Sequence, residues 1–160
     1  LVTLLVAISN FFWLPVGGAL SDRFGRKPVL IAMALLALAT SYPALTLLAS
    51  APSFSMMLIV LLWLSFLYGL YNGAMIPALT EIMPAEVRVA GFSLAYSLAT
   101  AVFGGFTPVM STALIEYTGD KASPGYWMSF AAVCALLATL YLYRRRAVSL
   151  QNTVKSQGAV

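Results

Sequence analysis

The sequence predicts an all-α membrane protein of about five transmembrane helices. Hydrophobic residues make up 61% of the 160 residues, charged residues only 9%, and the mean hydropathy is +0.91. Because a soluble domain carries about 25% charged residues, this chain has too few charges to cover a globular surface, and the bilayer must be its main solvent. The apolar runs are also about 20 residues long, whereas a strand of a membrane barrel needs only about 10.

Five apolar runs are long enough to cross a bilayer as helices, and none has an Asp, Glu, Lys or Arg well inside it. They occupy residues 1–20, 29–49, 56–80, 89–115 and 126–143. Short connectors separate them, which places the transmembrane region at residues 1–146. The polar, unpatterned residues 147–160 are predicted to form a disordered cytoplasmic tail. The chain begins without Met or a basic leader, so we expect it to start inside a longer protein.

The charges in the connectors predict the orientation of the spans. Basic residues lie in the first connector, in the third connector and directly after the fifth span: Arg23, Arg26, Lys27, Arg88 and Arg144 to Arg146. The second connector, residues 50–55, has no charge. Since loops rich in Lys and Arg stay in the cytoplasm, Leu1 is expected outside and the C-terminus inside. The last arginines are expected to lie at anionic lipid headgroups.

Composition and charge distribution disfavour several classes of function. The formal net charge of +4 would suit nucleic-acid binding, but the basic residues lie between or beyond apolar runs and form no face interleaved with aromatic residues. The chain has no His and one Cys, Cys134, so the usual zinc and Cys/His catalytic sets are absent. The acidic residues lie singly in connectors, which disfavours a membrane enzyme. No span carries the charged ring of a channel.

The first connector contains a ten-residue motif. Residues 18–27 have the sequence GALSDRFGRK, which fits G-x-x-x-D-R-x-G-R-K. On these residues the chain resembles the major facilitator superfamily, whose cytoplasmic loops carry this signature. Gly18 would let two helices approach closely, and Gly25 would permit a tight turn.

The charged residues of this motif suggest a gating role. Asp22 can lie against the positive N-terminus of a neighbouring helix, while Arg23 and Arg26 can pair with acids at other helix ends. If such pairs form in one conformation and break in another, they act as a latch for alternating access. The predicted latch loop comprises Gly18, Asp22, Arg23, Gly25, Arg26 and Lys27, with Glu81, Glu86 and Arg88 from the third connector. The alternative is that these charges only set the topology.

Three further segments resemble one branch of that superfamily, the metabolite:proton symporters, which include citrate, α-ketoglutarate and proline/betaine carriers. The segments are residues 68–77 (YGLYNGAMIP), 81–91 (EIMPAEVRVAG) and 95–106 (AYSLATAVFGGF). The first and third of them, together with residues 125–127, look most like the citrate carriers.

The resemblance covers residues 1–150 and implies the C-terminal portion, helices 8 to 12, of a twelve-helix carrier. It implies a multi-pass protein of the bacterial inner membrane that takes up citrate or a related tricarboxylate with a proton by alternating access. The implied partners are a small carboxylate solute, membrane lipid and the missing helices 1 to 7 of the same polypeptide, and no cofactor is implied beyond the coupling proton. The alternative is a symporter of the same family for α-ketoglutarate or for proline and betaine. Sugar porters are disfavoured, because residues 144–147 lack their motif.

Polar and aromatic side chains in three spans are candidates for the substrate cavity, which transporters place near the midplane. They are Asn10, Trp13, Tyr68, Asn72, Tyr96, Ser97 and Thr100. The last two belong to a stripe of small residues at steps of three and four, which either joins two helices or faces water. The stripe comprises Ser93, Ser97, Thr100, Gly104, Thr107 and Ser111. No charge lies at depth, although a tricarboxylate and a proton require charged groups, so we expect those groups in the missing helices.

Overall fold

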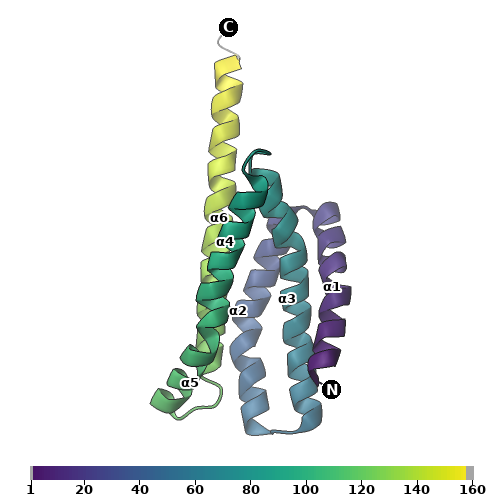
Figure 1. The fold of residues 1–160 in the computed structure, drawn as a ribbon, viewed down its shortest axis with the longest axis vertical. Coiled ribbons are helices and arrows are strands. Elements are labelled where there is room, and N and C mark those ends of the chain that lie inside the picture. The colour runs from purple at the N-terminus through teal and green to yellow at the C-terminus, as the bar shows by residue number, and fades with distance from the viewer. Residues whose placement is uncertain (1, 158–160) are drawn as a thin grey trace.

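The computed structural model describes residues 2–157, which are helical apart from short connectors and include no strand (Figure 1). The elements in chain order are α1 (Val2–Phe24), α2 (Arg26–Ser50), α3 (Phe54–Ile82), α4 (Arg88–Ala99), the π-helix η1 (Thr100–Gly105), α5 (Thr107–Thr118) and α6 (Pro124–Gln157). Together α4, η1 and α5 form one unit, so five helical units are long and apolar enough to cross a membrane. The predicted all-α fold with five spans is confirmed.

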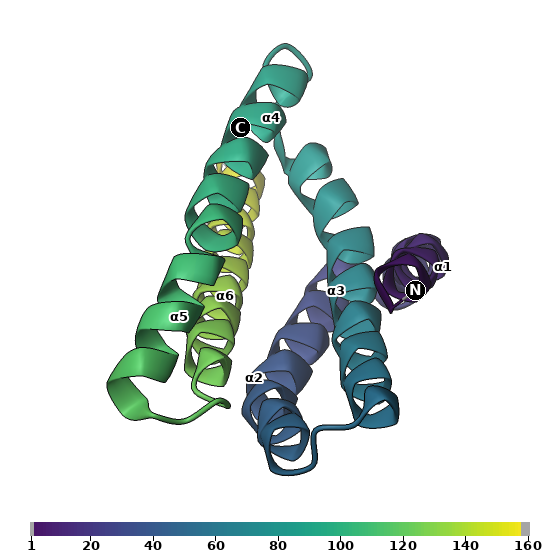
Figure 2. The ribbon, with the colours of Figure 1, turned by 60° about the horizontal axis from the view of Figure 1, so that its bottom comes forward.

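The helices run up and down with short connections (Figures 1 and 2). The most extensive contacts are those of α1 with α3, of α2 with α6 and of α2 with α3. In addition, α5 packs on α6. In contrast, α4 and α5 contain no buried residue. The α1–α2 and α3–α4 connectors lie at the same end of the molecule as the last turn of α6, and the α2–α3 and α5–α6 connectors lie at the other end (Figure 1).

Glycine residues bring α1 and α3 into backbone contact. A Cβ atom at Gly17 would lie 2.6 Å from the carbonyl oxygen of Leu70, and one at Gly73 would collide with the carbonyl oxygen of Leu14. Such contacts are typical of membrane helices, because small residues let backbones approach closely. Gly18 lies in the same contact, because a Cβ atom at Gly73 would be 2.8 Å from the Gly18 nitrogen. A Cβ atom at Gly18 itself would be 3.6 Å from the Gly73 carbonyl oxygen, so a side chain is less restricted there than at Gly17.

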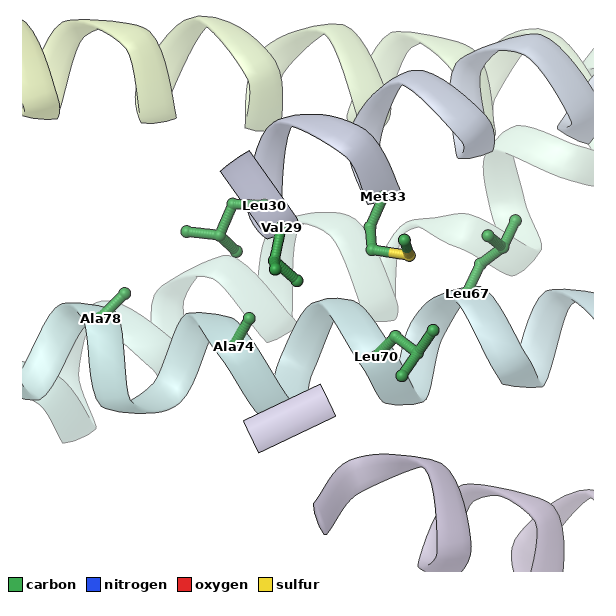
Figure 3. Packing of buried hydrophobic residues seen from close by; sticks show 7 residues of the cluster. All are labelled: Val29, Leu30, Met33, Leu67, Leu70, Ala74 and Ala78. Atoms are coloured by element: carbon green, nitrogen blue, oxygen red, sulfur yellow. The ribbon is translucent and has the colours of Figure 1, made fainter. Parts of the chain in front are cut away.

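A cluster of buried hydrophobic side chains lies between α2 and α3. Figure 3 shows the facing residues of this core: Val29, Leu30 and Met33 of α2, and Leu67, Leu70, Ala74 and Ala78 of α3. Both α2 and α3 bury one face in this way, while other parts of their surfaces stay exposed. Exposed aromatic residues are common in the chain, for example Phe11 and Phe12. This pattern fits helices whose outer solvent is lipid or further protein rather than water.

The end of α6 differs from the prediction. Residues 147–160 were expected to be a disordered tail, but α6 continues through Gln157, while residues 158–160 lie outside the described residues. The sequence has no Gly or Pro between Gly125 and Gly158, and Arg, Ala, Leu, Gln and Lys are good helix formers. The change to polar residues therefore marks where the apolar span ends, not where the helix ends.

Candidate functional site

A single residue, Gly25, connects α1 to α2. Its backbone has φ +94° and ψ 148°, a conformation that residues with a Cβ atom rarely adopt. The chain therefore reverses within one residue, as predicted for Gly25. This turn brings Arg26, the first residue of α2, back over the last turn of α1.

The Arg26 guanidinium connects three helix ends. On α3, Glu81 Oε1 accepts hydrogen bonds from Nη2 at 2.7 Å and from Nε at 3.2 Å. On α1, Arg26 Nη1 lies 2.5 Å from Asp22 Oδ1 and 2.5 Å from Ser21 Oγ. The Arg26 side chain is only 18% exposed, whereas Asp22 and Glu81 are 65% and 48% exposed. The structure thus joins Asp22, Arg26 and Glu81 of the predicted latch loop into one network.

The other charged residues of the latch loop lie outside this network. Among the described residues, neither Arg23 nor Lys27 nor Glu86 forms an ion pair. This finding corrects the expectation that Arg23 pairs with an acid at another helix end and that Glu86 is one of the acidic partners. The Arg23 guanidinium instead lies 5.8 Å from the centre of the Phe24 ring. Arg88 donates two hydrogen bonds of 3.3 Å to the Met83 carbonyl, where it satisfies a carbonyl at the end of α3.

Ser21 is a member of the network that the sequence reasoning missed. It is 1% exposed, its hydroxyl donates to the Gly18 carbonyl at 2.8 Å, and the same oxygen accepts from Arg26. It occupies a variable position of the motif, so the pattern of fixed residues could not identify it. Its spacing, three residues after Gly18 and five before Arg26, is the only signal in the sequence.

Two adjoining cavities lie beside α3. The first has a volume of about 250 Å³ and lies between α2, α3 and α6, and the second has a volume of about 480 Å³ and lies mainly between α3, the α4–η1 region and α6. Tyr71 on α3 lines both. Tyr68 lines the first and Tyr96 the second. Two of the predicted cavity residues therefore line adjoining cavities.

The other predicted residues on α1 and α3 have different surroundings. Asn72 is 7% exposed, and its Nδ2 donates to the Tyr68 carbonyl of its own helix at 2.9 Å. Trp13 packs edge-to-face on Phe66 with ring centres 4.7 Å apart, on the side of α3 that contacts α1. Asn10 is on α1 as well, and its buried Oδ1 has no hydrogen-bond partner among the described residues. Asn10 and Trp13 thus line neither of the two cavities.

The π-helix η1 interrupts the fourth span, which the sequence predicted as one continuous helix. Glycine at 104 and 105 weakens the α-helical form, and Pro108 has no N–H to donate to the preceding turn. The Thr107 hydroxyl donates to the Phe103 carbonyl and accepts from the Trp127 indole of α6 at 3.0 Å. Short π-helical insertions of this kind are frequent at functional sites.

The predicted stripe of small residues divides at this interruption. Thr107 faces α6 and belongs to a helix–helix contact. Ser97 and Thr100, the two members predicted to line the cavity, are exposed, as is Ser93. The reading of the stripe as a helix–helix contact therefore applies to Thr107.

Comparison with known proteins identifies the family. The family model of the Major Facilitator Superfamily matches residues 1–159. A citrate-proton symporter of Klebsiella pneumoniae is 89% identical over 152 residues, which are 95% of this chain and 34% of that protein. A citrate-proton symporter of Salmonella typhi is 59% identical over 145 residues, 91% of this chain and 33% of that protein. An alpha-ketoglutarate permease of Escherichia coli (strain K12) is 32% identical over 135 residues, 82% of this chain and 30% of that protein.

The chain spans about a third of the length of these curated relatives. No solved structure matches it. The family model covers nearly the whole chain, the described residues hold five helices able to cross a membrane, and residues 18–27 carry the loop signature. This chain is therefore a multi-pass membrane protein that belongs to the Major Facilitator Superfamily.

Proposed function

We propose that the chain forms helices 8 to 12 of a secondary active transporter of the bacterial inner membrane. The complete protein would take up citrate, or a related tricarboxylate, together with a proton by alternating access. The similarity to two proteins named citrate-proton symporters supports the solute and the coupling ion. Because the chain spans only about a third of those proteins, the substrate and the coupling are inferred for the complete transporter.

The observation that carries the proposal is the Arg26 network at the loop signature. It ties the adjacent ends of α1, α2 and α3 together through Asp22, Arg26 and Glu81. Alternating access in secondary transporters is largely a rocking of one bundle of helices against another. A bundle can rock only if it keeps its shape, and this network holds three of its helices at one end.

The same geometry refines the latch hypothesis. All three charged partners belong to one bundle, so the network stiffens that bundle. A contact that closes and opens against the other half of the transporter would require charges that this bundle leaves exposed. Asp22 keeps 65% of its side-chain surface exposed, and Lys27 is exposed as well. We propose these two as the residues that face the missing half.

The orientation follows from the placement of the basic connectors. The α1–α2 and α3–α4 connectors and the last turn of α6 lie at one end of the molecule (Figure 1). Lys and Arg accumulate at cytoplasmic loops, so we propose that this end is cytoplasmic. The Arg26 network would then close the cytoplasmic side of the bundle.

The solute would contact hydroxyl groups of this bundle. Tyr68 and Tyr96 belong to different helices, line adjoining cavities and remain partly exposed. A phenol can donate a hydrogen bond to a carboxylate. Among the described residues, no charged side chain lines the cavities, and a tricarboxylate needs cations to offset its charge. We propose that those cations, and the group that carries the proton, lie on helices outside this chain.

Uptake into vesicles tests the function. The complete transporter is reconstituted in liposomes and supplied with labelled citrate, with and without an imposed proton gradient. We expect accumulation only with the gradient and its loss on adding a protonophore. Uptake of equal size without the gradient would contradict symport. Excess unlabelled α-ketoglutarate, proline or betaine is then added, and competition stronger than that of citrate would favour the alternative solute.

A further inference from the structure

The Ser21 hydroxyl is the most deeply buried polar contact of Arg26. Ser21 is 1% exposed, and its oxygen lies 2.5 Å from Arg26 Nη1. The hydroxyl hydrogen is directed to the Gly18 carbonyl at 2.8 Å, which leaves the oxygen lone pairs for the guanidinium. The Ser21 oxygen is therefore held in place by its own helix before Arg26 binds to it.

The other two acceptors near Nη1 are weaker anchors. Asp22 Oδ1 is at 2.5 Å, but its side chain is 65% exposed, so water competes for the carboxylate and screens its charge. The Gly18 carbonyl is 3.4 Å from Nη1, which is a long hydrogen bond. Without the Ser21 oxygen, the guanidinium would depend on an exposed side chain and a distant carbonyl.

The direction of the guanidinium decides whether Arg26 reaches α3. The planar group has donors on opposite edges in a fixed arrangement. When Nη1 binds Ser21 on α1, the other edge presents Nε and Nη2 to Glu81 Oε1 at 3.2 and 2.7 Å. Rotation of the group away from Ser21 would lose one or both of those bonds.

We infer that Ser21 is a positioning residue of the latch loop, whose buried hydroxyl orients the Arg26 guanidinium toward Glu81. Ser21 acts through Arg26 and touches no solute. This role rests on the proposed function in one respect: its effect on transport requires that the Arg26 network stabilise one conformation of the rocking bundle. Its effect on the Arg26 contacts does not depend on any substrate.

Transport by the complete protein provides the first test. In Ser21→Ala we expect the maximal rate of citrate uptake to fall about tenfold, the effect of losing one hydrogen bond to a buried charged group. The KM for citrate is expected to stay unchanged, because no solute contact is lost. Ser21→Thr keeps the hydroxyl and is expected to restore the rate. A rate unchanged in Ser21→Ala would overturn the inference.

Ser65→Ala is the matched control for the loss of a buried hydroxyl. Ser65 is 4% exposed, its hydroxyl donates to the Val6 carbonyl of α1 at 3.2 Å, and it lines neither cavity; among the described residues it touches no charged group. We expect this variant to retain most of the uptake rate. An equal loss in Ser65→Ala and Ser21→Ala would show that any buried helix hydroxyl has this effect, and the inference would then be wrong.

Thermal unfolding of the purified complete protein gives a readout that needs no transport. The Tm is measured for Ser21→Ala, for Arg26→Ala and for the double variant. If Ser21 acts through Arg26, Ser21→Ala lowers the Tm in the native background and has little further effect with Arg26→Ala present. If Ser21→Ala lowered the Tm equally in both backgrounds, Ser21 would act through packing and not through Arg26. This result stands even if the transporter proves not to carry citrate, and even if the added methyl of Ser21→Thr impairs folding.

Discussion

Arg26 and Glu81 are 55 positions apart in the sequence, yet two guanidinium nitrogens of Arg26 share one carboxylate oxygen of Glu81, at 2.7 and 3.2 Å. The pair connects the first residue of α2 to the last turn of α3. Since the second edge of the same guanidinium binds Ser21 and Asp22 on α1, one side chain holds three helix ends.

Replacing Arg26 by Lys should distinguish the effect of the positive charge from that of the planar guanidinium group. Lysine keeps the positive charge but has no planar fork, so it can hold α1 or α3 but not both. Because Glu81 is 48% exposed, water screens the pair, and we expect a loss of about 1 kcal/mol in stability with a clear fall in uptake rate. Tm and uptake of the complete transporter check this. Lys121→Ala, which removes an exposed charge from the α5–α6 connector, serves as the control and should not lower the Tm.

The backbone contact between α1 and α3 predicts a steep dependence on side-chain size. In Gly73→Ala the new Cβ would collide with the backbone of Leu14, and we expect destabilisation of about 1–3 kcal/mol, typical of overpacking. Gly105→Ala is the matched control, because a Cβ there meets nothing within 4 Å. The two variants are compared by thermal unfolding in detergent. Similar Tm values would mean that α1 and α3 adjust without cost.

The hydroxyl of Thr107 should matter for the shape of the fourth span. Thr107→Val keeps the volume but removes the partner of the Trp127 indole and of the Phe103 carbonyl, at a cost of about 1 kcal/mol. We expect a shift in the fluorescence of Trp127, measured in the complete transporter with every other tryptophan, including Trp13 and Trp63, replaced by Phe. Thr107→Ser retains the hydroxyl and should leave the spectrum as it is. A shift of the same size in both variants would argue against a role for the hydrogen bond.

The proposed contacts with the solute predict different effects of substitutions at Tyr96 and Asn72 on the KM for citrate. Tyr96→Phe removes one hydroxyl from a cavity wall and should raise the KM for citrate about threefold to tenfold. Asn72→Ala should leave that KM near its native value, because the amide is buried and bonded to its own helix. Tyr117→Phe, on a side chain 92% exposed and outside both cavities, is the control. A raised KM in Asn72→Ala alone would reverse this assignment.

Features that depend on polarity along the chain were predictable from the sequence. The lengths of the apolar runs predicted five spans. The tight turn at Gly25 was predictable because few residues other than glycine adopt a φ of +94°. The ion pair of Arg26 with Glu81 was among the expected pairs, since both residues flank connectors at the same predicted side of the membrane. These inferences need only local chemistry and the alternation of the spans.

Features that depend on the packing of particular helices were not predictable. Ser21 looks like any small residue until its burial against Arg26 is known. Gly18 and Gly17 are adjacent, and only the angle between α1 and α3 decides that a Cβ atom has no room at Gly17 but has room at Gly18. A π-helix over residues 100–105 could be suspected from the glycines and Pro108 as a bend, but its register depends on Thr107 and on Trp127 of another helix.

The one-residue connection at Gly25 has a mechanical consequence. A single residue provides no spare chain length, so α1 and α2 cannot slide along each other by even one helical turn, about 5.4 Å. Any displacement of the end of α1 must be followed by the beginning of α2, and through Glu81 by the end of α3. Two residues inserted at this position, each adding at most about 3.6 Å, would supply that missing length and uncouple the helices without removing any charge. The length of the loop is thus as important to a rocking bundle as the residues within it.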